Sequence, residues 1–142
     1  TALGDEGLPA ISKLRSLKRL SLSATRVGDL GLKVIAKIRG LESLDLSGTN
    51  ITHVGLKYLK PLSNLSHLDL GENGIRDDGM MHLSAFKNMQ SLTLNYNRLT
   101  DLSVDYLKGY KQLKFLNLKG NLVSDKKKAE LIESMPHTTV NT

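Results

Sequence analysis

The chain has 142 residues, a length typical of one domain, and its content of 39% apolar and 24% charged residues excludes wholesale disorder. It contains no cysteine, which excludes disulfides and thiolate metal sites, and no apolar run reaches the roughly 18 residues that a membrane span needs. The formal net charge of +6 raises the question of nucleic-acid binding, which depends on where the charges fall.

An internal repeat of 24 residues organises the chain. Rows that begin at residues 17, 41, 65, 89 and 113 carry Leu or Met at place one and Leu at places four and six. Place nine is occupied by Thr25, Thr49, Asn73, Asn97 and Asn121. We therefore interpret 1–142 as a single repeat domain, because five rows in constant register are not expected from a helical bundle with coincidental leucines. Its expected parts are a partial repeat 1–16, full repeats 17–40, 41–64, 65–88, 89–112 and 113–136, and a terminal strand or cap 137–142.

The first 16 residues match the back half of a repeat whose strand is missing. Thr1 falls at place nine, and Asp5 and Leu8 fall at the later places where other rows carry Asp and an apolar residue. We therefore expect the parent protein to extend upstream.

Each full repeat is predicted to form a short strand followed by a helix of about two turns. Apolar residues at places sixteen, nineteen and twenty-two, such as Leu32, Ile35 and Ile38, are spaced as on one helix face. Asp residues at place thirteen are expected to cap these helices, and Thr52 takes this role where His53 replaces Asp. The predicted capping residues are Asp5, Asp29, Asp77, Asp101 and Asp125.

The last row becomes polar. Residues 126–128 are all lysine, Pro136 ends the predicted helix, and 137–142 repeats the strand pattern in a degraded form. Terminal repeats that become polar serve as caps, so we expect the array to end here.

The pattern LxxLxLxx(N/T) resembles that of the leucine-rich-repeat family over essentially the whole chain. The 24-residue rows are similar to bacterial and protist arrays and to the repeats of F-box-type effectors. The resemblance implies an α/β fold, a right-handed solenoid with a parallel β-sheet on the concave face and short helices on the convex face. It also implies that the side chains at place nine satisfy backbone groups of adjacent turns, and that the chain recognises a protein.

Charge is distributed unevenly over the repeats. Residues 17–40 carry six cations and one carboxylate, a net charge of +5, whereas residues 65–88 carry four carboxylates and two cations, a net charge of −2. Many lysines fall on helical places that face solvent, so the basic excess is interpreted as a solvated convex face, although phosphate binding at the first repeat and at 126–128 stays open. These lysines are Lys33, Lys37, Lys57, Lys60, Lys108 and Lys111.

Places three and five of each strand must point away from the leucine core, because side chains alternate along a strand. The surface they form runs from basic, through acidic, to a polar and aromatic zone. The candidate binding residues on this concave face are Arg19, Glu42, Asp45, His67, Asp69, Glu72, Tyr96 and Phe115.

Two features of this surface have alternative interpretations. Asp45 and Asp69 should stand about 5 Å apart on adjacent strands, where they either repel each other and hold a cation or are hydrated and hydrogen-bonded to Ser and Thr neighbours. Phe115, with Tyr96 expected nearby, is either an interface anchor or an isolated exposed aromatic residue.

Catalysis is the weaker hypothesis. Ser43, His67 and Asp69 are the right residue types for a catalytic triad, but an open sheet offers them neither a pocket nor oxyanion donors. We expect no enzyme activity, no metal and no cofactor. The expected function is that of a monomeric protein-interaction module that binds a protein rather than nucleic acid, as part of a longer protein. The alternative is a structural or surface array that binds carbohydrate or an anionic polymer. A cytoplasmic or secreted effector is favoured over a disulfide-capped extracellular protein.

Overall fold

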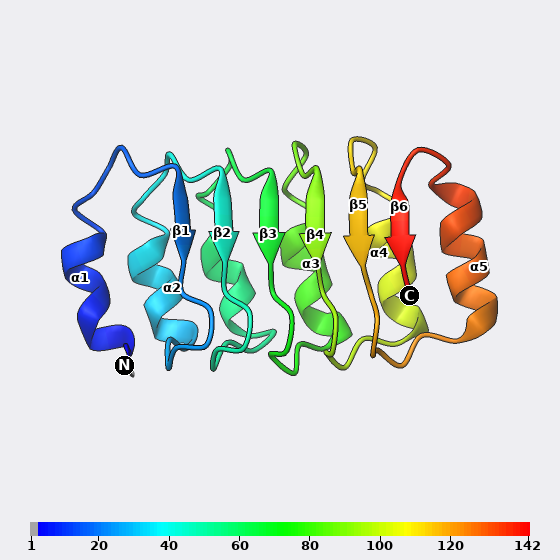
Figure 1. The fold of residues 1–142 in the computed structure, drawn as a ribbon, viewed down its shortest axis with the longest axis horizontal. Coiled ribbons are helices and arrows are strands. Elements are labelled where there is room, and N and C mark those ends of the chain that lie inside the picture. The colour runs from blue at the N-terminus through cyan, green and yellow to red at the C-terminus, as the bar shows by residue number, and fades with distance from the viewer. Residues whose placement is uncertain (1–2) are drawn as a thin grey trace.

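The computed structural model describes residues 3–142, so Thr1 lies outside the described residues. Its central feature is one sheet of six parallel strands that lie in sequence order (Figure 1). Each strand follows the previous one after 24 residues, which confirms the register that the repeat predicted. The strands are β1 (Arg19–Ser21), β2 (Ser43–Asp45), β3 (His67–Asp69), β4 (Ser91–Thr93), β5 (Phe115–Asn117) and β6 (Thr139–Asn141).

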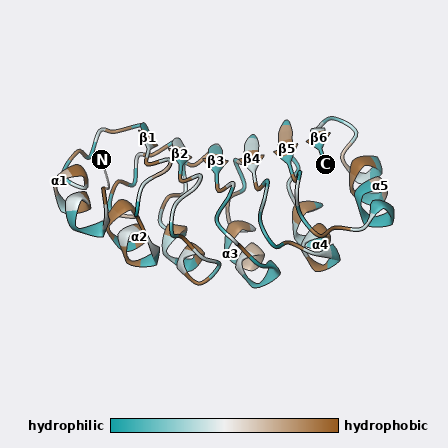
Figure 2. Ribbon diagram, turned by 60° about the horizontal axis from the view of Figure 1, so that its bottom comes forward, coloured by the Kyte–Doolittle hydropathy of each residue, from teal (hydrophilic) through white to brown (hydrophobic). Residues whose placement is uncertain are grey.

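Short helices run behind the sheet, one helical segment in each repeat (Figure 2). Three of them begin as a 3-10 turn and continue as a short α-helix, two are α-helical throughout, and the segment of repeat 41–64 is 3-10 throughout. The 3-10 turns are η1 (Asp5–Gly7), η2 (Gly55–Leu59), η3 (Asp77–Gly79) and η4 (Asp101–Ser103). The α-helices are α1 (Leu8–Ile11), α2 (Asp29–Ile35), α3 (Met80–Leu83), α4 (Val104–Leu107) and α5 (Asp125–Ser134).

A single leucine-rich core lies between the sheet and the helices. The central residues of four strands are aligned side by side and are all buried: Leu44, Leu68, Leu92 and Leu116. Because each row of leucines packs against the rows before and after it, stability is a property of neighbouring repeats. Leu20, in the first strand, is only half-buried, since the described residues place no strand on its other side.

The Asn residues at place nine bridge adjacent repeats, as expected. The side-chain amide of Asn97 donates to the backbone oxygens of Leu70 and Leu94 at 2.9 and 3.0 Å, and its oxygen accepts from the N–H of Ile75 at 2.9 Å. Asn97 is buried, so these bonds satisfy backbone groups that water cannot reach.

The prediction that the place-thirteen Asp residues cap their own helices is wrong. Asp29 is the first residue of α2, and Gly28 holds the N-cap position before it. The Asp29 carboxylate instead accepts from the backbone N–H and the hydroxyl of Thr52, in the next repeat, at 2.8 and 2.6 Å. Asp5, Asp77 and Asp101 accept from Gly28, Thr100 and Ser124 in the same way, so we call this series of links the Asp ladder.

Two of the described helical segments, η4 and α5, start at a hydroxyl side chain that caps them. Thr100 and Ser124 occupy N-cap positions and accept from backbone N–H groups of their own helices, and Asp125 follows Ser124 as the first residue of α5. Thr52 accepts from the N–H of Val54 at 3.2 Å, but Val54 is itself the N-cap residue of η2 and no side chain caps this segment, so the prediction that Thr52 caps it is wrong.

The Asp ladder explains two of the glycines at place fifteen. A Cβ atom added at Gly31 would overlap the carboxylate of Asp5, and one added at Gly55 would overlap that of Asp29. At the equivalent position beside Asp77 the chain carries Ser103, so a glycine is not required at every link of the ladder.

The carboxyl-terminal row forms a regular sixth strand. Val140 pairs with Leu116, which confirms that 137–142 contains a strand of the same sheet. Across residues 3–142, none of the helices has both the length and the apolar character required for a membrane span.

Candidate recognition surface

The outward-facing side chains of the sheet form two aligned rows. The place-three row runs through Arg19, Ser43, His67, Ser91, Phe115 and Thr139. The place-five row runs through Ser21, Asp45, Asp69, Thr93, Asn117 and Asn141. Parallel pairing at this register brings each residue next to its equivalent in the following repeat, so the chemistry of the surface can be read along each row.

Asp45 and Asp69 are direct partners on β2 and β3. Both oxygens of Asp45 are engaged, one by the Ser21 hydroxyl at 2.9 Å and the other by the N–H and hydroxyl of Ser47 at 3.0 and 2.8 Å. The interpretation that serine neighbours satisfy this carboxylate is therefore confirmed for Asp45. Asp69 accepts from the N–H of Gly71 through one oxygen, at 2.9 Å.

The carboxyl group of Asp69 is shifted toward its neutral form. Partial burial is the largest cause of its raised pKa, the bond from Gly71 opposes it, and the charges of Asp45 and Glu72 raise the pKa further. The pKa of Asp69 is higher in the folded than in the unfolded state. As pH rises from the unfolded-state pKa through the folded-state pKa, ionisation of Asp69 therefore lowers the free energy of unfolding. A cation placed here would offset this cost.

Glu72 and Tyr96 project from turns with a left-handed backbone. Their φ angles are 59° and 51°, and the equivalent residues in neighbouring repeats, Gly48 and Gly120, have φ angles of 60° and 73°. Glycine adopts this conformation without steric cost, whereas residues with a side chain do so at about 1 kcal/mol or more. Two large side chains are therefore held where glycine suffices in the repeats on either side.

Tyr96 is the exposed aromatic residue of the surface, and Phe115 is less exposed than expected. Tyr96 is 51% exposed and its ring lies against Gly120, where an added Cβ atom would collide with it. Phe115, at the start of β5, is half-buried. Tyr96 lies beyond the end of that strand, where its N–H donates to the backbone oxygen of Lys119. The two residues therefore lie at different positions along the strand direction.

The remaining candidates are separated by local pairing. The ammonium group of Lys18 lies 3.1 Å from the carboxylate of Glu42 at the first strands, and Arg19 is exposed beside them. His67 pairs through Nδ1 with the Ser66 hydroxyl at 2.9 Å.

The geometry does not assemble a catalytic triad. No hydrogen bond links His67 to Asp69 or to Ser43 among the described residues, although all three side chains belong to the outward rows. Within residues 3–142, no group of three or more His, Asp or Glu residues is arranged to hold a metal ion.

Two parts of this surface were not foreseen from the sequence. The first is the left-handed backbone at place eight, for which the glycines at 48 and 120 were the available signal. The second is the use of place-five oxygens to bind the backbone two residues later, seen at Asp45, Asp69 and Asn117. The second feature gives these side chains a structural role besides any role in binding.

The chain belongs to the leucine-rich-repeat family. The family model described as leucine rich repeat matches residues 15–75 and 63–123, which together cover most of the chain. This family is a non-catalytic repeat fold that generally serves in protein–protein interaction.

Solved structures of bacterial leucine-rich-repeat proteins are similar to this chain. A leucine-rich-repeat protein of Leptospira interrogans has 28% sequence identity and a TM-score of 0.72, with 93% of this chain and 33% of that protein covered. Two Listeria monocytogenes proteins, an internalin and internalin C2, each have 22% identity and a TM-score of 0.59. The match covers 92% of this chain and 49% of the internalin, and 99% of this chain and 77% of internalin C2.

This chain thus spans about a third of the Leptospira protein and about half of the internalin. The comparison with curated proteins finds no match. The neighbours agree with the expectation of a bacterial type of array, whereas the similarity to F-box-type effector repeats is not confirmed.

Proposed function

We propose that the chain is a monomeric, non-enzymatic recognition module that binds a protein partner on the concave face of its sheet. The observation that carries this proposal is the pair of large side chains, Glu72 and Tyr96, held in left-handed turns. Backbone strain of this kind persists where the surrounding structure enforces it, and it is concentrated at functional sites. We name Asp69, Glu72 and Tyr96, together with Asp45, the acidic–aromatic zone.

The chemistry of this zone favours a partner segment with positive charge and an apolar residue. Asp69 is destabilised as an anion by burial and by its acidic neighbours, so an incoming Lys or Arg stabilises its ionised form. Tyr96 offers an exposed ring supported by Gly120, and aromatic side chains with such support are frequent anchors of binding energy.

The test uses labelled synthetic peptides that carry Lys or Arg next to Leu or Phe, with acidic peptides of equal length as controls. We expect the basic peptides to bind in fluorescence anisotropy, and Tyr96→Ala or the paired Asp45→Asn and Asp69→Asn change to weaken binding about tenfold. Phe115→Ala is expected to have a similar effect where the peptide reaches β5, whereas Lys37→Ala and Lys60→Ala on the helix side should change nothing.

A matched pair of glycine variants isolates the position of the Tyr96 ring. Gly48→Ala and Gly120→Ala both introduce a side chain at positive φ, but only the second collides with Tyr96. Both variants should lose a comparable amount of stability. Gly120→Ala should nevertheless weaken peptide binding more than Gly48→Ala does. Equal binding by both variants, or stronger effects of the helix-side lysines than of the zone, would contradict the proposal.

A further inference from the structure

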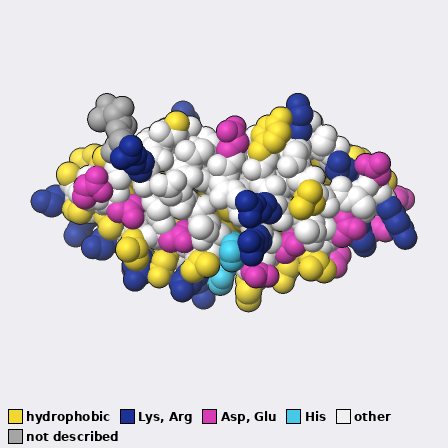
Figure 3. Space-filling model, turned by 90° about the horizontal axis from the view of Figure 1, so that it is seen from below, with side chains coloured by type: hydrophobic (Ala, Val, Ile, Leu, Met, Phe, Trp, Pro, Cys, Tyr) yellow, Lys and Arg dark blue, Asp and Glu magenta, His cyan; other side chains and the backbone are white. Residues whose placement is uncertain are grey.

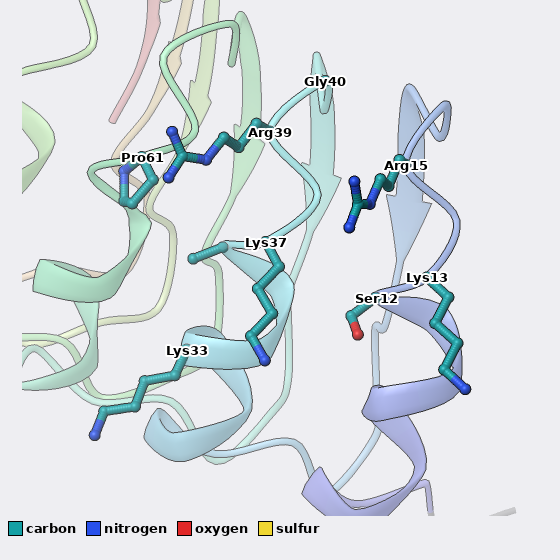
Figure 4. Close-up of a pocket in the computed structure, with 9 residues that line it drawn as sticks. Ser12, Lys13, Arg15, Lys33, Lys37, Arg39, Gly40 and Pro61 are labelled. Atoms are coloured by element: carbon teal, nitrogen blue, oxygen red, sulfur yellow. The ribbon is translucent and has the colours of Figure 1, made fainter.

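A basic hollow lies on the helix side of the first two repeats, away from the outward face of the sheet. It has a volume of about 790 Å³ and is lined by the ends of α1 and α2 and by the loop that leads to β2 (Figure 4). Ser12, Ala36, Gly40 and Pro61 complete its wall. Its charged lining residues are Lys13, Arg15, Lys33, Lys37 and Arg39.

A second hollow of about 380 Å³ continues the first toward the next repeat. The two share Lys33, Ala36 and Pro61, and the second adds Lys57, Tyr58 and Lys60. We call the combined surface the basic trough. It crosses three successive helical segments, because its residues come from α1, α2 and η2 or their ends.

Among the described residues, none of the charged side chains of the basic trough forms an ion pair. The ion pairs found in residues 3–142 involve other lysines, such as Lys18 with Glu42 and Lys127 with Glu130. No Asp or Glu lines either hollow. The seven positive charges of the basic trough repel one another, and a bound anionic ligand offsets that repulsion.

The arrangement of the side chains favours an extended ligand. In Figure 4, Lys13 and Lys33 point away from each other on opposite sides of the hollow, with Lys37 between them. The guanidinium group of Arg39 is directed toward Pro61, on the side where the second hollow continues. A compact anion would contact only part of this set, whereas a linear one can contact residues from all three segments.

We propose that the basic trough binds an anionic polysaccharide that carries sulfate groups. Ala36 and Pro61 give the second hollow apolar surface beside its lysines. Sugar rings present apolar faces together with charged substituents, and they match this combination better than inorganic polyphosphate, which has no apolar face.

The same hollow is a poor site for nucleic acid. Tyr58 is half-buried, and the ammonium groups of Lys33 and Lys57 lie 4.9 and 5.2 Å from the centre of its ring. Single-stranded nucleic acids bind through aromatic rings on which bases stack, and Tyr58 does not present a free ring for this purpose.

The experiment measures binding of a labelled heparin fragment to the whole chain and to two triple variants. The trough variant is Lys33→Gln, Lys37→Gln and Arg39→Gln, and the control variant changes the exposed Lys111, Lys119 and Lys126 to Gln. Both remove three positive charges, so they have the same net charge. We expect the trough variant to bind heparin at least about tenfold more weakly than the control variant. Its log Kd should also depend less steeply on log salt, because fewer counterions are released when heparin binds to fewer positive charges.

Polyphosphate, a single-stranded oligonucleotide, desulfated heparin and anionic lipid vesicles serve as competitors. Each should compete less well than the sulfated fragment. Equal heparin affinity of the two triple variants would overturn the site, and equal or better competition by any of the four probes would overturn the assignment to a sulfated polysaccharide. Tyr96→Ala should leave heparin binding unchanged, which keeps this proposal distinguishable from that for the concave face.

Discussion

Two neighbouring repeat boundaries differ in how they are tied together. Between repeats 65–88 and 89–112, Asp77 accepts from the N–H and hydroxyl of Thr100 at 2.9 and 2.6 Å, and the N–H of Arg98 donates to Ile75 O at 2.8 Å. Between repeats 41–64 and 65–88, His53 stands in place of the Asp, and no bond from the N–H of Gly74 to Ile51 O is found in the described chain. The second boundary therefore lacks both links near the helix starts.

Strand pairing and an Asn bridge are present at both boundaries. The strands pair in register, with Leu44 next to Leu68 and Leu68 next to Leu92, and Asn73 and Asn97 bridge the turns. The sheet and the core thus join every pair of neighbouring repeats, while the Asp ladder varies between repeats. His53 interrupts this ladder in the middle of the array.

The interruption leaves a polar group without a partner. The Nδ1 atom of His53 is buried and has no hydrogen bond within the described residues. Arg76, which occupies the N-cap position of the next repeat, has no Asp opposite it and is a bridge partner of Arg98. From below, histidine and basic side chains are seen together near the middle of this edge (Figure 3).

Core truncation should have the largest effect and should not distinguish the two boundaries. Leu68→Ala and Leu92→Ala each remove a buried side chain that packs against both adjacent repeats, and each should lower the free energy of unfolding by about 2 to 5 kcal/mol. Urea unfolding followed by circular dichroism measures this loss. A loss well under about 1 kcal/mol at both sites would contradict the role of the core in joining the repeats.

Removal of an Asp from the intact boundary should have a smaller effect. Asp77→Ala leaves the N–H and hydroxyl of Thr100 without their carboxylate partner, and we expect a loss of about 1 kcal/mol in the free energy of unfolding. Asp78→Ala is the control, since this neighbouring carboxylate is exposed and has no such bond in the described residues. Equal unfolding curves for the two variants would show that the Asp ladder does not contribute to stability.

Repair of the interrupted boundary should produce the smallest change, in the opposite direction. His53→Asp removes the unpaired Nδ1 atom and places a carboxylate opposite the N–H of Arg76, and we expect a gain of about 0.5 to 1 kcal/mol in the free energy of unfolding. His82→Asp, at a half-buried helical position outside the ladder, is the control. A loss of stability in His53→Asp would mean that this boundary is built for histidine and not merely interrupted by it.

The sequence by itself determined the repeat boundaries, the strand register, the core leucines and the two outward rows of the sheet. These follow from a constant period and from the alternation of side chains along a strand, both of which are properties of the local chain. The roles of Asn73, Asn97 and Asn121 were also predictable, because the resemblance to the family attaches that role to place nine.

Only the tertiary structure decided which partner each polar side chain takes. Asp29 was expected to bind its own helix but binds Thr52, 23 residues later, because the next coil brings that residue closer than the free amides of α2. Phe115 lies at the start of β5 and Tyr96 in the turn opposite Lys119, because the pairing of neighbouring repeats sets where each side chain falls along the strand direction. The sequence placed a basic excess in residues 17–40 and lysines on the solvent side of several helices. Only the structure joins these charges into the basic trough, because a hollow that spans three coils is created by stacking and not by any one repeat.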